Sequence, residues 1–505
     1  MRILTGAAIR GPIAPATAFV AFAALASAGT FSSFPVQKIA PVCFGVALVA
    51  VSYRRALQWR SLMAATVLVI IFIPVQRYAL PSSLPFQLEP YRLLVAFIAL
   101  AWFTSLLIDP RVRLRRTGFE APLGAYVVSV AISLLLNGTR VQETSSILIK
   151  TLMFTMSYFV IVYLLPSVLS RIQDIDALCK AFVKGGAWVA AAAVVESRTG
   201  YNVFNHLTRF IPVLHMQALP FANGSDATGM SRGGRIRAYA SAEHPIALGA
   251  ALVMLMPLTP YLAKRTGQRR WWAYAGLLML GLFATVSRTG FLMLIVVTMI
   301  FVWFRWHEVK RYWPALFPLV IVIHLAVPGT LGTMVQSFFP KGGLVAQQAN
   351  QNVGSGRLAT LGPVLTKEFL PNPIFGEGYG TRISGTNGPG VVDNAPILDD
   401  EWAGVLAEVG VVGTLAFVWV FVRAVRRMRY LSKTLDDERS LLATGLAAGI
   451  AAFGVGMLTF DAFSFVQVTF FFWFFLALAG AFIAQTARQE RMQTTAHASP
   501  AHGRA

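Results

Sequence analysis

The chain has 505 residues, of which 56% are hydrophobic and only 13% are charged, and its mean hydropathy is +0.62. Soluble domains carry about 25% charged residues, so this composition excludes a soluble globular protein and predicts a polytopic α-helical membrane protein. The net charge of +21, from 43 Lys and Arg against 22 Asp and Glu, does not indicate nucleic-acid binding, because much of the excess lies in short clusters between apolar runs.

The composition gives no sign of metal or disulfide chemistry. The 7 His residues do not cluster with cysteine at the spacing of metal ligands, so we expect neither a metal nor a cofactor. The two cysteines, Cys43 and Cys179, fall on opposite sides of the predicted membrane map. We therefore expect no disulfide between them.

The apolar runs are about 17–22 residues long, which is the length that crosses a bilayer core. They predict an all-α, polytopic transmembrane helix bundle of about 12–14 spans with two long extracytoplasmic loops; the range allows for short or tilted helices. In chain order, the candidate spans lie near residues 12–29, 36–53, 61–77, 92–108, 119–136, 146–166, 180–197, 244–263, 273–286, 290–305, 313–328, 402–422, 440–459 and 463–485.

Clusters of Lys and Arg orient these spans. In a map of 14 spans, all the large clusters fall on one side, together with both termini, and the positive-inside rule assigns this side to the cytoplasm. The clusters lie within residues 54–60, 111–116, 264–270, 305–311 and 423–429.

Two long segments fall on the opposite, extracytoplasmic side. Loops longer than about 15 residues between packed elements are usually functional or disordered. Within the second one, "SGRLATLGPVLTKEFL" has apolar residues at helical spacing and predicts an amphipathic helix on the membrane surface. We divide the chain into N-terminal transmembrane helices (1–197), an extracytoplasmic loop (198–243), transmembrane helices (244–328), a large extracytoplasmic loop (329–401), C-terminal transmembrane helices (402–485) and a cytoplasmic tail (486–505).

Several arginines are predicted on the extracytoplasmic side. Arg288 lies in a tight turn between two apolar runs, where it either snorkels or forms a fixed cation for a phosphate or carboxylate. Arg232, Arg235 and Arg237 lie within six residues of one another and are either solvated surface or an anion-binding patch. In the second loop, Arg357 and Arg382 either add to this patch or are solvated. The next helix follows "SAEHP", in which Ser241 or Glu243 is the expected cap.

Four acidic residues mark the start of the helix that follows the large loop. Asp399 or Asp400 is the expected N-cap, and a capping carboxylate is a weakened base. One cap does not explain three consecutive acids. Glu401 and Glu408 are seven residues apart, so they lie on one helical stripe, with Glu408 about 10 Å further along the axis. An ionisable group at that depth indicates a functional or ion-paired residue, and Arg288 is a candidate partner.

Four stretches together resemble the O-antigen ligase/O-antigen polymerase superfamily of multispanning, GT-C-type membrane glycosyltransferases. They are similar to the family's arginine-led helix entry, its Ser-Arg turn, its Gly-Arg segment with a glycine-rich end, and its helix after the large loop. The resemblance covers about residues 230–415. The stretches are "RIRAYASAEHPIALGAALVMLMPL", "TVSRTGFLML", "SGRLATLGPVLTKEFLPNPIFGEGYGT" and "LDDEWAGVLAEVGVVG".

The resemblance implies a metal-independent enzyme of cell-envelope polysaccharide or lipopolysaccharide biosynthesis. It would sit in the inner (plasma) membrane as a multi-pass protein, with its active site on the extracytoplasmic side. It would move a glycan from a polyprenyl (undecaprenyl) diphosphate donor to a saccharide or glycolipid acceptor, with membrane lipid but no nucleic acid as a further partner. By position, the implied diphosphate-binding residues are Arg235, Arg237, Arg288 and Arg357, and the implied catalytic residues are Asp399, Asp400 and Glu408.

The chain departs from the family pattern at the expected base. Asp399 stands where a ligase has histidine, nine residues before Glu408, and Asp400 takes the position of the family's asparagine. Either one of these acids is the base, or the chain belongs to the polymerase-like branches. A carboxylate is an adequate base when burial and neighbouring acids raise its pKa.

Two other classes remain open at this stage. A transporter or a flippase of lipid-linked glycans would also be multispanning, but such proteins often have repeated halves and interrupted helices, which this sequence does not clearly show. A scaffolding membrane protein would not need arginine-rich and acid-rich helix entries on one face. Ligase and polymerase are not separated by these residues.

Overall fold

The computed structural model describes residues 58–81, 88–217, 231–232, 235–312, 361–362, 364–381 and 400–497, together with a few single positions between 314 and 332. The predicted spans at 12–29 and 36–53, most of the span at 313–328, and the predicted site residues Arg357 and Asp399 lie outside the described residues.

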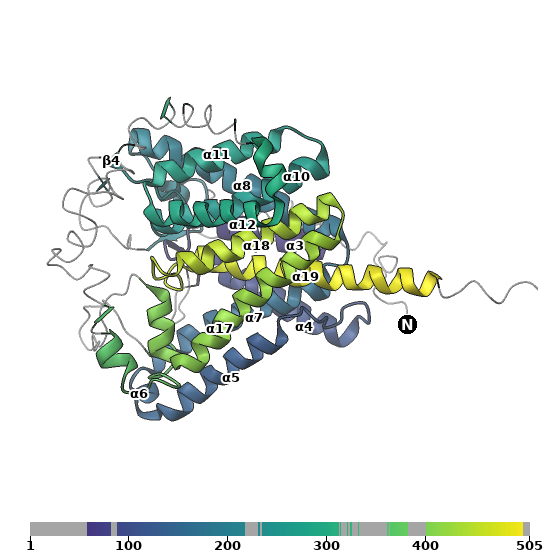
Figure 1. Ribbon diagram of the computed structural model, residues 1–505. Helices are drawn as coiled ribbons and strands as arrows, with labels where there is room; N and C mark the ends of the chain where they lie inside the picture. The colour runs from purple at the N-terminus through teal and green to yellow at the C-terminus, as the bar shows by residue number, and fades with distance from the viewer. Residues whose placement is uncertain are drawn as a thin grey trace, which may run out of the picture.

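The described chain is a bundle of α-helices (Figure 1). Its helices are α3 (Trp59–Phe72), α4 (Pro90–Ile108), α5 (Glu120–Leu136), α6 (Gly138–Glu143), α7 (Ser145–Val168), α8 (Ile172–Thr199), α9 (Pro245–Leu255), α10 (Thr259–Thr266), α11 (Arg270–Thr285), α12 (Arg288–Tyr312), α17 (Glu401–Thr434), α18 (Asp437–Gly456) and α19 (Val466–His497).

The bundle also contains short strands and short helical segments. Two small antiparallel pairs are formed by β1 (Tyr78–Ala79) with β2 (His215–Met216), and by β3 (Ser231–Arg232) with β4 (Arg235–Ile236). Three short helical segments complete the description, namely η1 (Val203–Arg209), η2 (Met256–Leu258) and η4 (Val364–Phe369).

Within the described ranges, eight helices are long and apolar enough to cross a membrane, and α3 and α5 are shorter apolar helices. The prediction of an all-α, polytopic membrane helix bundle is therefore confirmed. Only helices satisfy all their backbone hydrogen bonds internally without a barrel, which is why apolar runs of this length adopt this conformation.

The centre of the bundle is built around α19, which packs against α7, α9 and α18. Its apolar part is buried over the whole membrane-length window, as expected for a helix that is hydrophobic on all sides. Aromatic rings fill this centre: Phe472 stacks on Phe453 at 4.6 Å and on Phe421 at 5.0 Å between ring centroids. Such close packing, rather than hydrophobic exclusion from water, is what holds helices together in lipid.

A break in α17 positions the glycine-rich loop "GEGYGT". At Gly410 the backbone adopts φ +65° and ψ −169°, which divides α17 into two helical parts. The freed N–H groups of Val411 and Val412 donate to the carbonyl oxygens of Pro373 and Ile374 at 2.9 and 3.2 Å. In return, the carbonyls of the first part accept hydrogen bonds from the N–H groups at 377 and 378. The sequence predicted an uninterrupted span at 402–422, so this break is a correction.

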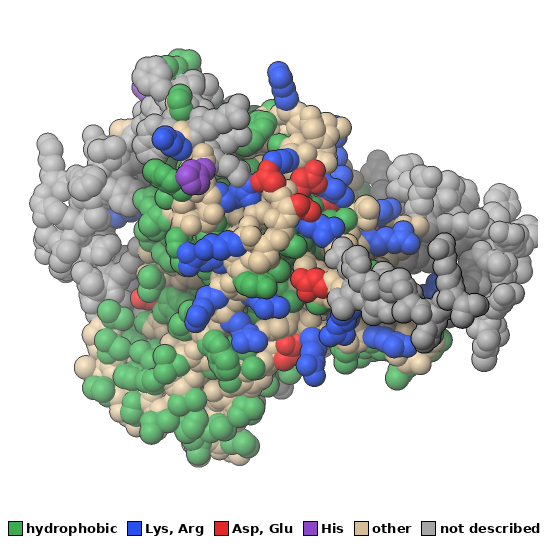
Figure 2. Space-filling model, turned by 45° about the vertical axis from the view of Figure 1, so that its right-hand side comes forward, with side chains coloured by type: hydrophobic (Ala, Val, Ile, Leu, Met, Phe, Trp, Pro, Cys, Tyr) green, Lys and Arg blue, Asp and Glu red, His purple; other side chains and the backbone are tan. Residues whose placement is uncertain are grey.

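Charged side chains gather at one end of the bundle. In Figure 1, β4 and α6 lie towards the left and the C-terminal part of α19 towards the right. Figure 2 brings the right-hand side forward and shows Lys and Arg side chains gathered there with several acids, next to an apolar surface. The ion pairs of this end include Lys264 with Asp437 and Arg265 with Glu438. Lys264 and Arg265 belong to a basic cluster that the sequence leads us to expect on the cytoplasmic side.

Candidate functional site

The turn between α11 and α12 presents Arg288 at the first position of α12. Val286, in the middle of the turn, has φ +47°, a left-handed conformation that is a genuine outlier for a β-branched residue. Ser287 is fully buried and its oxygen atoms accept the N–H groups of Gly290 and Phe291, both at 3.3 Å. The first residue of a helix lies at the positive end of the helix dipole, so an anion bound there is favoured by both charges.

Arg237 lies against the same turn. Its side chain is 8% exposed, and its Nε donates to the carbonyl of Thr285 at 3.3 Å, three residues before Arg288. The neighbouring N–H of Ala238 donates to the carbonyl of Ala284 at 3.0 Å. Two of the predicted diphosphate ligands are thus anchored to one turn. Arg235 lies in β4 opposite Arg232.

A buried polar network fixes the segment that carries Arg237. Arg77, which is 2% exposed, donates to the carbonyls of Ala240 and Ala242 at 3.0 and 2.5 Å. The carboxylate of Glu196, from α8, accepts the N–H of Ala240 at 2.8 Å. Ala240 itself has φ +43°, a conformation that persists only where the surroundings determine it. The sequence analysis missed Arg77 and Glu196; their only signal is that charged residues close two apolar runs.

A polar cavity of about 490 Å³ opens beside Arg237. Its walls include Asn202, Asn205, His206 and Tyr239. The ring of His206 stacks on that of Tyr201 with 4.8 Å between centroids. Amide groups that both donate and accept, next to stacked rings, match the alternating hydroxyls and flat faces of a sugar.

The structure describes the acidic start of α17 from Asp400 onward. Asp400 is the N-cap, since its Oδ1 accepts the N–H groups of Trp402 and Ala403 at 3.0 and 3.4 Å. This confirms that one acid caps the helix, and it weakens Asp400 as a base, because the cap stabilises the ionised form.

Glu401 is buried and faces a second acid. Its Oε2 accepts the N–H of Phe463 at 2.8 Å, and the carboxyl group of Asp461 lies near it. The start of α17 therefore contains a carboxyl pair as well as a helix cap.

The loop between α18 and α19 joins the starts of three helices. Thr459 donates to Thr289 at the start of α12, with 2.9 Å between the oxygens. The Met457 carbonyl accepts the N–H of Glu401 at 2.8 Å. Phe465 stacks on the ring of His244, which begins α9, at 5.6 Å. The spans predicted at 440–459 and 463–485 leave three residues between them, and the role of this connection as a hub was not predicted.

Glu243 is a further buried acid at this hub. Its Oε1 accepts the N–H of Gln467 at 3.1 Å, whereas its Oε2 is buried with no hydrogen-bond partner among the described residues. Burial raises the pKa of the Glu243 carboxyl to about 7. Glu243 does not cap α9, as the sequence suggested for it or Ser241. His244 is the cap, because its Nδ1 accepts the N–H of Ile246 at 3.1 Å.

Glu408 binds the glycine-rich loop. Its Oε2 accepts the N–H of Gly380 at 3.1 Å, and its carbonyl oxygen accepts the hydroxyl of Ser133 at 2.6 Å and the N–H of Gly378 at 3.1 Å. The adjacent Glu377 is ion-paired with Arg140 of α6. These contacts hold the loop against the first part of α17.

The preceding helical turn also contacts α17. Val364 is fully buried and packs against Ala403 and Ala407. The residues expected to form an amphipathic helix on the membrane surface are described only at 361–362 and from 364 onward, and this part uses its apolar side to cover α17.

Residues 273–418 match the family model described as O-Antigen ligase. The match begins within α11, includes Arg288, and ends in α17 beyond the break at Gly410. The match supports the resemblance to the O-antigen ligase/polymerase superfamily that the sequence suggested. At family level it supports an O-antigen ligase-type membrane glycosyltransferase, in agreement with the multi-pass helix bundle.

Arg237 and the polar cavity lie outside the segment that matches the family model. No curated protein matches the chain. Across the part of the chain that the structure describes, no group of three or more His, Cys, Asp and Glu residues has the arrangement of a metal site.

Proposed function

We propose that the protein transfers a glycan from a polyprenyl (undecaprenyl) diphosphate donor to a saccharide or glycolipid acceptor, as an O-antigen ligase or a surface-polysaccharide polymerase. The observation that carries this proposal is the anchoring of Arg237 to the carbonyl of Thr285, three residues before Arg288. It supports a single cationic site for the diphosphate, formed by a turn and a helix start.

The electrostatics of this turn suit the reaction. When the glycosidic bond to the donor breaks, negative charge develops on the leaving diphosphate, and fixed cations in a water-poor site stabilise it. A guanidinium group presents its N–H donors in a planar fork that fits phosphate oxygens in pairs. We assign Arg237 and Arg288 to this role, with Arg235 and Arg357 as additional ligands.

The acceptor hydroxyl must lose a proton as it attacks. We propose Asp399 as the base, placed directly before the cap residue Asp400, whose carboxylate is occupied by two backbone N–H groups. Glu243 is the second candidate, because it is buried with a carboxylate oxygen that has no hydrogen-bond partner among the described residues. Glu408 acts by positioning the glycine-rich loop.

The saccharide part of the donor is proposed to occupy the cavity next to Arg237. Its volume of about 490 Å³ lies within the usual range for small-ligand sites, about 300–1,000 Å³. Tyr239 lines this cavity and is held from behind by the guanidinium of Arg77, 4.9 Å from its ring centroid. The active site is proposed to face the extracytoplasmic side, opposite the basic clusters.

Gene deletion followed by electrophoresis of the surface glycans tests this function. Single repeat units on the acceptor would indicate a polymerase, and polymer accumulating on the lipid carrier would indicate a ligase. Complementation with Arg288→Ala is expected to fail at normal membrane expression. The matched control Arg426→Ala, an exposed arginine of α17, is expected to restore the glycans. Unchanged glycans in the deletion strain would refute the proposal.

A further inference from the structure

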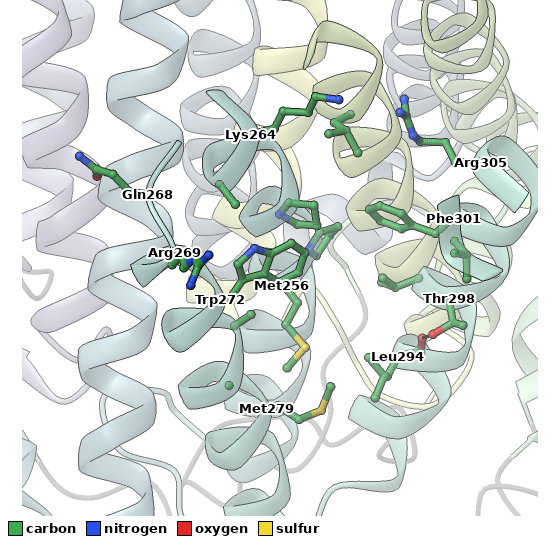
Figure 3. A pocket seen from close by; sticks show the side chains of 18 of the residues that line it. Met256, Lys264, Gln268, Arg269, Trp272, Met279, Leu294, Thr298, Phe301 and Arg305 are labelled. Atoms are coloured by element: carbon green, nitrogen blue, oxygen red, sulfur yellow. Dashed lines mark hydrogen bonds between the residues drawn. The ribbon is translucent and has the colours of Figure 1, made fainter. Parts of the chain in front are cut away.

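A second cavity lies between α10, α11 and α12. It has a volume of about 1,000 Å³. Figure 3 shows Lys264 and Arg305 at one end of it and Met279 and Leu294 at the other. The cavity therefore has one charged end and one apolar end.

The apolar part follows one side of α12. Leu294, Val297 and Phe301 line it at helical spacing, and Met256 and Met279 face them from the other helices. From Leu294 to Arg305 the helix rises about 16 Å, at 1.5 Å per residue. This length and lining suit a flexible hydrocarbon chain, since methionine side chains adapt to irregular apolar partners.

The charged end carries an excess of positive charge. The lining residues include three cations, Lys264, Arg269 and Arg305, and no Asp or Glu. Asp437, just outside the lining, is ion-paired with both Lys264 and Arg305. Counted over the cavity lining and Asp437, one carboxylate against three cations leaves an excess of two positive charges, with Arg269 beside Trp272 between the two ends (Figure 3).

Arg305 is built into the cavity wall. Its side chain is 8% exposed, and its backbone departs from helical geometry, with φ −140° and ψ +46°. The hydroxyl of Ser440 accepts a hydrogen bond from its Nη1 at 2.5 Å. A cation held in this way, next to an apolar groove between helices, is the arrangement that recognises an anionic lipid headgroup.

We infer that this cavity binds an anionic phospholipid of the cytoplasmic leaflet, with its phosphate at Lys264, Arg269 and Arg305 and an acyl chain along α12. The donor lipid does not fit this charge pattern. Its diphosphate belongs at Arg288, about 25 Å along α12 from Arg305 at 1.5 Å per residue. A polyprenyl tail that reached the cavity from there would place hydrocarbon, and not phosphate, among the cations.

The test uses the fluorescence of Trp272, which lines the cavity. The full chain is placed in nanodiscs that contain phospholipids with brominated acyl chains, which quench a tryptophan in contact with them. The chain has 11 Trp residues, so the signal of Trp272 is the difference between the wild type and Trp272→Phe. Brominated phosphatidylglycerol is compared with brominated phosphatidylcholine at equal mole fractions.

One charge contributes about fivefold to anionic-lipid binding near a membrane surface, so the two excess charges predict a preference of about 25-fold for phosphatidylglycerol. Arg269→Gln should reduce the preference to about fivefold. Gln268→Glu, which adds an acid at the same rim without removing an arginine, should reduce it similarly. Arg113→Gln, an exposed arginine in another basic loop, should leave it unchanged.

Equal quenching of Trp272 by the two brominated lipids would overturn the inference, since the groove would then select only hydrocarbon. Displacement of the brominated phosphatidylglycerol by a stoichiometric amount of undecaprenyl diphosphate would also overturn it, because the cavity would then belong to the donor. Equal quenching leaves the assignment of Arg288 untouched, so the inference can fail separately from the proposed glycosyl transfer, whereas displacement by undecaprenyl diphosphate would count against both.

Discussion

Replacing Gly410 by alanine should separate the glycine-rich loop from the first part of α17. At φ +65° and ψ −169° the position is open essentially only to glycine. A Cβ atom there would lie 2.3 Å from the carbonyl oxygen of Ile374. This neighbour is backbone, so the clash is not relieved by a side-chain rotation, and the segment at 373–374 has to move.

The magnitude follows from the hydrogen bonds that cross the break. Four backbone bonds join residues 373–378 to residues 407–412, and each contributes about 1 kcal/mol net. Backbone strain of an alanine at this conformation adds about 1–3 kcal/mol. We expect Gly410→Ala to destabilise the docked loop by roughly 5–7 kcal/mol, enough to leave it undocked in nearly all molecules.

The assay is complementation of surface glycan in a deletion strain, with membrane expression and thermal unfolding of the purified protein measured in parallel. Gly410→Ala is expected to lose glycan transfer while the bundle still inserts. Gly124→Ala is the matched control, because an added Cβ in this α5 glycine meets nothing within 4 Å. Wild-type glycans and stability with Gly410→Ala would refute the view that the break in α17 positions the loop.

Three further substitutions test the site. The pKa of the Glu243 carboxyl is about 7 in the folded protein and about 4.3 in the unfolded chain. Between these two pH values the folded state binds more protons than the unfolded state. The free energy of unfolding should therefore fall by roughly 3 kcal/mol as the pH rises through this window. Unfolding of Glu243→Gln by denaturant should lack this slope, and an unchanged slope would contradict the assignment. Arg77→Ala should lower the free energy of unfolding by at least about 3 kcal/mol, because it leaves buried carbonyl groups without their donor. Arg77→Lys should not restore this stability. Wild-type stability of either variant in thermal unfolding would contradict the network. Asp400→Ala should lower the free energy of unfolding by about 1 kcal/mol, because the helix cap is lost. Asp400→Asn should keep both the cap and glycan transfer. Loss of transfer in Asp400→Asn would instead make Asp400 a base.

Hydrophobic runs predicted the helices of the described chain well, because a helix in lipid needs only length and apolar side chains. They did not predict the break at Gly410, since the compensating hydrogen bonds come from residues 373–378, which no local pattern connects to α17. Irregular backbone at this depth is possible only where another segment satisfies it.

Within the candidate site, too, some residues were predicted from the sequence and others were not. Arg288 was singled out because arginine next to lipid needs a reason, and Arg237 because three arginines lie within six residues; the structure anchors Arg237 to the turn that precedes Arg288. The roles of Arg77 and Glu196 depend on contacts 163 and 44 residues away in the chain, so their charge alone did not reveal them. The hub between α18 and α19 is composed of ordinary turn residues, and only the packing of three helix starts against it identifies it.

The central claim is that Arg237 and Arg288 bind the diphosphate of the donor. The most direct measurement is the binding of undecaprenyl diphosphate and undecaprenyl monophosphate to the purified protein in nanodiscs. The wild type should bind the diphosphate more tightly, Arg237→Ala and Arg288→Ala should each weaken it by at least tenfold, about 1.4 kcal/mol, and Arg426→Ala should have no effect. Equal binding of diphosphate by the wild type and both variants would contradict the account.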